Sequence, residues 1–284
     1  MKRILALVVV LLAFGIQAKA QQVTSGLTPD EYVNDILLGS GVTAFNIQYT
    51  GAPEQIGHYT DGQGDWFPLT EGLVLSTQFS TDFVQEDCIE TFDMLTNPVA
   101  GDPDLLDIAN SVGGLIGQPI NVTSVNDVCA LEFDFIATGD TVKFNYSFAS
   151  DEWLTWINSQ YNDIFAFFLS GPGITGPYNS PAGFPGGAVN IAEVPGITPQ
   201  LPITISSVNP DLNSEFYNDN PQNDDVCVNG FTVRLEAVYP VSCGETYHIK
   251  LAIADGSDTA LESVVVLEAG SFTSNSVVDV DLSI

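Results

Sequence analysis

The chain has 284 residues, of which 36 are acidic and only 6 are basic, so its formal net charge is -30. A protein surface of that sign repels phosphate backbones and anionic lipids, which argues against nucleic acid as a partner and against membrane insertion. Apolar residues make up 45% of the sequence, which is too much for a disordered acidic tail, so we expect a folded core.

The first twenty residues have the three parts of a secretory signal peptide. Lys2 and Arg3 form a basic start, residues 4–14 are apolar, and an A-x-A box ends at Ala20. The apolar run is shorter than the ~20 residues that a membrane-spanning helix needs. We therefore expect residues 1–20 to be a signal peptide cleaved near Ala20, and the chain to be secreted or located at the cell surface.

Strand signals separated by turn residues recur through residues 21–275. Their apolar residues alternate with polar ones, as in Leu131, Phe133 and Phe135, which is typical of strands with one buried face. The predicted strands are residues 44–49, 73–77, 130–136, 142–149, 164–169, 203–208, 230–238, 247–254, 264–269 and 277–282. Many short strands without long alternating helices predict an all-β fold, an antiparallel β-sandwich of jelly-roll type in a single domain. Residues 276–284 would be a C-terminal strand or the start of a linker or further module.

One or two short helices interrupt this pattern. Asp102 is suited to cap a helix, Pro103 fits the first helical position, and Asp104 suits the positive end of the helix dipole. A second helix is predicted at residues 85–95.

The candidate ligand residues of the sequence lie at the ends of two predicted strands. Residues 142–149 alternate between apolar and polar, whereas residues 164–169 are apolar throughout, which predicts a central strand covered on both sides. If the two strands pair as a hairpin, the acids at their loop ends meet at one end of the sheet.

Calcium takes six to eight oxygen ligands, and these loop ends supply several. A second turn, residues 255–258, offers more. The candidate metal ligands are Asp151, Glu152, Asn162, Asp163, Asp255 and Asp258. The sequence predicts a calcium (Ca2+) site there, and the alternative is that these side chains only cap turns.

Three aromatic residues lie in the same loop: Trp153, Trp156 and Tyr161. Exposed, they would form a surface for an extracellular glycan or protein ligand. Alternatively, they pack beneath their own loop, and we expect this of one Trp.

The four cysteines are Cys88, Cys129, Cys227 and Cys243, and an exported chain favours two disulfides. Cys227 and Cys243 flank the predicted strand 230–238, which extends ~30 Å, so they are too far apart to bond unless that strand is broken. The preferred pairing is Cys129 with Cys243 and Cys88 with Cys227. Free, buried cysteines are the alternative.

Several motifs follow one another in an order that resembles the choice-of-anchor L domain family over most of residues 27–272. In chain order they are GDPDLLDIA, LEFDFIATGDTVKFNYSFAS, SFASDEW, YNDIFAFFLSGPG, NIAEVPG, NGFTVRLEA, CGETYHIKLAIADGSD and VVVLEAGSF. The resemblance implies a secreted or cell-surface β-sandwich module of Bacteroidota-type bacteria. Family members often continue into a sorting domain of the type IX secretion system, whereas this sequence stops at Ile284, so we expect a fragment or a chain without its anchor. Leu261-Glu262-Ser263 departs from the family pattern, which weakens a ligand role for that turn.

No catalytic motif is present. The sequence has only His58 and His248, with His248 expected on a solvent-facing side of its strand, and it has no zinc, serine-hydrolase or phosphate-binding signature. We therefore expect a non-enzymatic binding or adhesion module with no catalytic residues and no cofactor except Ca2+. The alternative is a carboxylate-based glycoside hydrolase or another polysaccharide-active enzyme, in which two acids flank the bond that is cleaved.

Overall fold

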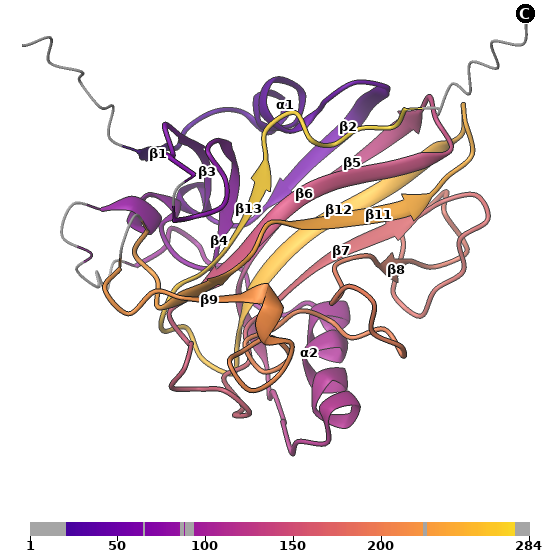
Figure 1. Ribbon diagram of the computed structural model, residues 1–284. Helices are drawn as coiled ribbons and strands as arrows, with labels where there is room; N and C mark the ends of the chain where they lie inside the picture. The colour runs from indigo at the N-terminus through magenta and orange to yellow at the C-terminus, as the bar shows by residue number, and fades with distance from the viewer. Residues whose placement is uncertain (1–20, 65, 86–87, 89–93, 224–225, 276–284) are drawn as a thin grey trace, which may run out of the picture.

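The computed structural model describes residues 21–64, 66–85, 88, 94–223 and 226–275 (Figure 1). The predicted signal peptide, the predicted strand 277–282 and most of the predicted helix 85–95 lie outside these residues. The described chain forms two antiparallel sheets that face each other. None of its helices is long and apolar enough to cross a bilayer.

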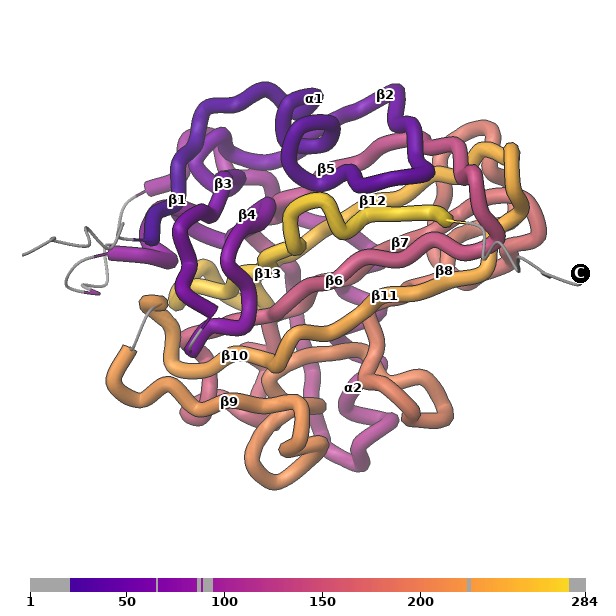
Figure 2. The backbone as a smooth tube through the Cα atoms, turned by 45° about the horizontal axis from the view of Figure 1, so that its top comes forward, coloured from indigo at the N-terminus to yellow at the C-terminus, as the bar shows by residue number. Residues whose placement is uncertain are grey.

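The larger sheet has eight strands in the order β1-β3-β4-β13-β6-β10-β9, with β11 also paired to β6. Its strands are β1 Gln22–Thr24, β3 Ile56–Thr60, β4 Gly72–Ser76, β13 Ser263–Glu268, β6 Thr141–Ser150, β10 Gly230–Thr232, β9 Tyr217–Asp219 and β11 Leu235–Pro240. Figure 2 shows β4, β13, β6 and β10 side by side.

The smaller sheet has five strands in the order β2-β5-β12-β7-β8. Its strands are β2 Val42–Thr50, β5 Val125–Ala137, β12 Thr246–Gly256, β7 Ile164–Ser170 and β8 Val189–Asn190. Strand β12 is central, since it pairs along most of its length with β5 on one side and β7 on the other.

The connections between the strands are those of a jelly roll. From β4 to β7 each strand lies in the opposite sheet to the one before it, and β8 stays beside β7. Strands β10 and β11 both pair with β6 in the larger sheet, after which β12 joins the smaller sheet and β13 returns to the larger one. The resulting orders, β4-β13-β6-β10 and β5-β12-β7-β8, are those of two interlocked Greek keys. The predicted all-β antiparallel sandwich of jelly-roll type is confirmed.

Strand β7 explains why residues 164–169 are apolar throughout. Phe165, Phe167 and Leu169 pack into the core between the sheets. Ile164, Ala166 and Phe168 point the other way, into a second core shared with helix α2. The predicted central strand covered on both sides is confirmed, and Figure 1 shows α2 outside the smaller sheet.

Helix α2, Pro103–Ile116, begins as predicted. The Asp102 carboxylate accepts hydrogen bonds from the backbone N–H groups of Asp104 and Leu105, both at 3.0 Å. It ends at Gly117, which adopts a left-handed conformation with φ of 72°. The remaining helical segments are short: α1 Pro29–Glu31, a π-helical turn Tyr32–Leu37, and the 3-10 turns Pro53–Gln55, Ser80–Val84 and Ser214–Phe216.

Three strand predictions are wrong. Strands β6 and β7 do not form a hairpin, because residues 151–163 cross from the larger sheet to the smaller one. Residues 203–208 form a buried turn, in which Ser207 Oγ donates to the Pro202 carbonyl at 2.6 Å and so replaces a strand ladder. The predicted strand 230–238 is split into β10 and β11, next to the point where Thr232 Oγ1 accepts the Phe148 N–H at 3.0 Å.

The cysteines follow only half of the preferred pairing. Cys88 and Cys227 form a disulfide, with their Cα atoms 5.0 Å apart. Cys129 is free and buried, and Cys243 is free and exposed, so the predicted bond between them is wrong. The reason is their positions along β5. Cys129 lies near the start of that strand, whereas Cys243 lies beside its end at Ala137, eight residues or ~26 Å further on.

Candidate functional site

Acidic side chains gather at one end of the sandwich. Strand β6 ends at Ser150, which is paired with Ser263 at the start of β13 in the larger sheet. In the smaller sheet, β7 begins at Ile164, which is paired with Ala254 near the end of β12. The loop ends that carry the predicted ligands therefore meet across the two sheets, although no hairpin joins them.

Asp163 is the best-anchored acid of this group. It is fully buried. Its Oδ1 accepts the Gly256 N–H at 2.8 Å, and its Oδ2 accepts the Ser263 hydroxyl at 2.7 Å. Asp163, which immediately precedes β7, is thus hydrogen-bonded to the last residue of β12 and to the first residue of β13.

Its neighbours are buried without such partners. Both carboxylate oxygens of Asp255, Oε2 of Glu152, and the amide oxygen and nitrogen of Asn162 make no hydrogen bond within the described residues. All three side chains are at most 1% exposed. An unpartnered buried polar atom is costly, and an unpartnered buried charge more so.

The protonation of these acids reflects this environment. Burial raises the pKa of Glu152, and the charge of Asp163 raises it further. Burial also raises the pKa of Asp163, although its bonds from Gly256 and Ser263 act in the opposite direction. Burial and the Asp163 charge raise the pKa of Asp255, although the Thr77 side chain acts in the opposite direction. In the described part of the chain, no salt bridge involves these three acids.

Two predicted ligands lie at the rim, and two further acids join the cluster. Asp151 and Asp258 are half-buried. Asp127, at the start of β5, is buried, and its pKa is raised by that burial. Glu262 is buried and accepts the Ser76 hydroxyl at 2.7 Å. The sequence did not predict these last two, because a single acid at a strand end carries no signal until the strand register is known.

The cluster is not a ready-made metal site. Among the described residues, no group of three or more His, Cys, Asp or Glu side chains is arranged to hold a metal ion. An ion would therefore need oxygen from Asn162, hydroxyls or backbone carbonyls as well, or a rotation of Glu152 and Asp255 toward it.

One tryptophan of the predicted aromatic surface is packed inside the protein, as expected, and the other is exposed. Trp153 is 1% exposed, and its indole N–H donates to the Val208 carbonyl at 2.9 Å, so it belongs to the core and not to a ligand surface. Trp156 is 37% exposed, and its ring contacts that of Tyr161 with centroids 4.8 Å apart. Only these two remain at the surface.

The position of His248 differs from the expectation. It lies on the outer face of the smaller sheet but is 6% exposed, because the loop that contains Phe184 covers it. Its Nδ1 is 2.9 Å from Asp134 Oδ1. Burial by a distant loop is invisible in a local pattern of alternating residues.

One family matches the chain, namely the choice-of-anchor L domain, over residues 20–273. No curated protein and no solved structure matches it. The matched range contains both sheets, the acidic cluster and the motifs from which the sequence predicted this resemblance. The chain therefore belongs to the choice-of-anchor L domain family, which makes it a cell-surface-associated module.

Proposed function

We propose that this chain is a non-enzymatic binding module of the cell surface, whose fold is completed by calcium at the acidic end of the sandwich. Its partner would be an extracellular glycan or protein. The observation that carries the calcium part is Asp255, whose two carboxylate oxygens are buried without a hydrogen-bond partner in the described residues.

The chemistry of the cluster favours calcium over other ions. Its unpartnered ligands are oxygens, from Asp255, Glu152 and the Asn162 amide, and oxygen is what calcium prefers. Calcium also tolerates irregular geometry, and extracellular modules bind it with Kd values of roughly 10⁻⁴ to 10⁻³ M. A cation would neutralise acids that otherwise must be protonated to remain buried.

Thermal unfolding in calcium and in chelator tests this proposal. A ligand that binds only the folded state at ten times its Kd stabilises it by about 1.4 kcal/mol. For a chain of this size the melting temperature should then rise by about 3–5 °C. Magnesium should act more weakly, because it demands stricter geometry.

Substitutions locate the ion. Asp255→Asn should abolish the calcium response without lowering the melting temperature in chelator, because it replaces an acid that without the ion must take up a proton by a neutral side chain of the same shape. Asp163→Ala should also abolish most of the response, but it should lower stability in both conditions because it loses two hydrogen bonds. Asp107→Asn, on the exposed side of α2, is the matched control and should leave the response intact. If the unsubstituted protein melts at the same temperature in calcium and in chelator, the calcium site is wrong and these acids only cap turns.

A carboxylate-based glycoside hydrolase is the alternative function. One observation favours it, since Asp104 and Glu132 line the same cavity. Asp104, however, already accepts hydrogen bonds from the backbone and side chain of Asn179 at 2.9–3.1 Å. Release of reducing sugar from polysaccharides, lost in Glu132→Gln, would establish the hydrolase and contradict the binding-only proposal.

A further inference from the structure

The outer face of the smaller sheet carries a row of polar residues across three neighbouring strands. His248 in β12 is paired with Asp134 in β5 and with Ser170 in β7. Two residues further along β12, Lys250 is paired with Glu132 and with Phe168. Because side chains alternate along a strand, all six lie on this one face.

Five of these side chains, all but that of Asp134, line a cavity of about 170 Å³. Ser170, His248, Lys250 and Glu132 line it from the sheet, and Asn179 and Ser180 line it from the loop that follows β7. Its volume is about that of six waters in the liquid, at ~30 Å³ each. It therefore has room for one small ring and not for a folded peptide.

Two polar atoms at this cavity lack partners. Ser170 Oγ and His248 Nε2 are buried and make no hydrogen bond within the described residues. Glu132 Oε2 is 3.3 Å from Nε2, but without hydrogen-bond geometry. A ligand hydroxyl group can both donate and accept, so it can satisfy each of these atoms in either tautomer of the histidine.

Most charged groups around the cavity already have partners, and Glu132 adds a negative charge to its lining. Lys250 Nζ is bonded to the Asp102 carboxylate, and Asp104 is satisfied by Asn179. His248 Nδ1 is bonded to Asp134. A neutral ligand therefore fits better than an anion, which the net charge of -30 would repel.

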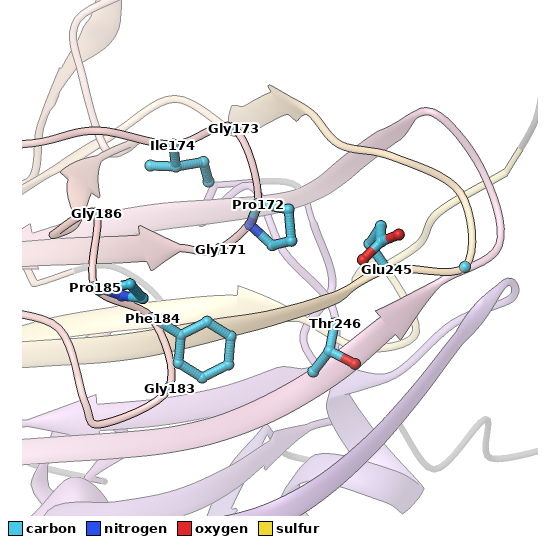
Figure 3. A pocket seen from close by; sticks show the side chains of 11 residues that line it. Gly171, Pro172, Gly173, Ile174, Gly183, Phe184, Pro185, Gly186, Glu245 and Thr246 are labelled. Atoms are coloured by element: carbon cyan, nitrogen blue, oxygen red, sulfur yellow. The ribbon is translucent and has the colours of Figure 1, made fainter.

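A second, larger pocket of about 610 Å³ adjoins the same loop. It is lined by Pro172, Ile174, Phe184, Glu245 and Thr246, and Figure 3 shows these side chains around it. The Phe184 ring also contacts His248, with ring centroids 5.7 Å apart.

The loop between the two pockets is held in place. Backbone hydrogen bonds link Tyr178 and Ala188 in both directions, and the Ser180 hydroxyl donates to the Phe184 carbonyl. A chain of ring-shaped units could thus place one unit in the polar cavity and lay the next across the aromatic and proline surfaces of the larger pocket.

We propose that this cavity binds one unit of a neutral polysaccharide, with Ser170 and His248 bonding to its hydroxyl groups and the neighbouring units extending past Phe184. This inference rests on the proposed binding role and names its ligand class. It does not involve the acidic cluster, which lies at the other end of β7.

Calorimetric titration of the calcium-loaded protein with neutral tetrasaccharides tests the proposal. The probes are cello-, manno-, xylo- and galacto-tetraose and the four corresponding monosaccharides. At least one tetrasaccharide should bind, and more tightly than its monosaccharide. Ser170→Ala and His248→Gln should each weaken binding about tenfold, because each removes one buried hydrogen bond to the ligand.

Matched controls separate binding from folding. Ser80 has a buried hydroxyl without a partner in the described chain, and His58 pairs with Glu71 at 3.0 Å, both away from this cavity. Ser80→Ala and His58→Gln should leave the affinity unchanged. Phe184→Ala should weaken binding of the tetrasaccharide but not binding of the monosaccharide.

Three outcomes would overturn the proposal: no binding of any neutral sugar at millimolar concentration, unchanged affinity in Ser170→Ala and His248→Gln, or equal loss in the two control variants. A calcium-dependent melting temperature together with any of these outcomes would leave the calcium proposal standing and reject only the sugar site.

Discussion

The Ser263 hydroxyl donates a 2.7 Å hydrogen bond to Asp163 Oδ2, and this contact joins the two sheets of the sandwich. Ser263 is the first residue of β13 in the larger sheet, and Asp163 immediately precedes β7 in the smaller sheet. Both side chains are fully buried. The acidic end of the molecule is therefore closed by a polar contact between the two sheets.

This contact should be measurable as a coupling energy. In a double-mutant cycle, Ser263→Ala and Asp163→Ala should be coupled by about 1.5–3 kcal/mol, because a buried hydrogen bond to a charged acceptor is among the stronger ones. Urea unfolding of the four proteins gives the value. Ser170→Ala, seven residues or ~23 Å along β7 from Asp163, is the control. Its effect on the free energy of unfolding should simply add to that of Ser263→Ala. A coupling below about 0.5 kcal/mol would show that the contact does not form in solution.

The raised pKa values predict how stability depends on pH. Burial raises the folded-state pKa of Glu152, Asp163 and Asp255 above their unfolded values of roughly 4. The folded state then binds more protons than the unfolded state above pH 4, so the free energy of unfolding should fall as the pH rises from 5 to 8 in chelator. Calcium should flatten this dependence, because it replaces the protons.

A variant isolates this cluster from the general effect of the net charge. Glu152→Gln combined with Asp255→Asn should give a flatter pH profile in chelator than the unsubstituted protein. Denaturant unfolding at each pH gives the free energy of unfolding of both proteins. A stability that rises from pH 5 to 8 in chelator would mean that these acids are ionised and satisfied in the folded state.

The two free thiols should differ in reactivity. Cys243 is exposed, whereas Cys129 is buried and its pKa is raised to about 12 by that burial. A thiol reagent should therefore label Cys243 in the folded protein and Cys129 only after unfolding. Non-reduced peptide mapping should recover Cys88 linked to Cys227. A peptide linking Cys129 to Cys243 would contradict the structure.

The two tryptophans of the segment 151–163 should contribute very differently to stability. Trp153→Ala should lower the free energy of unfolding by about 3–5 kcal/mol, because it removes a buried ring that contacts Phe148 and Tyr217. Trp156→Ala should change it by less than about 1 kcal/mol, because that ring is at the surface. Thermal or urea unfolding followed by circular dichroism checks both. Equal effects would mean that the segment packs differently.

Local patterns were sufficient to predict most strands and the helix. The alternation of residues 142–149 predicted a strand, which is β6, and the capping pattern at Asp102 predicted where α2 begins. These signals depend on residues within one turn or one strand, which sequence spacing records directly. The partner of each strand depends on the whole chain, and so the β6–β7 hairpin and the Cys129–Cys243 bond were both wrong.

The acidic cluster was predicted in spite of the wrong hairpin. A hairpin and a crossing between sheets both bring the end of β6 and the start of β7 to the same end of the molecule, so Glu152 and Asp163 meet in either case. The contributions of Asp127 and His248 could not be predicted in this way. Their environments depend on register and on loops that are remote in sequence.

The position of β13 has a consequence for the synthesis of the chain. This strand is the last to be made among those described, yet it lies between β4 and β6 in the middle of the larger sheet. Until residues 263–268 have emerged, β4 and β6 both lack a neighbour, and the sheet stays split into two halves with open edges. Every N-terminal fragment that stops before Ser263 should therefore remain unfolded or aggregate through those edges. Folding of this module therefore has to wait until almost the whole of the described chain has been synthesised.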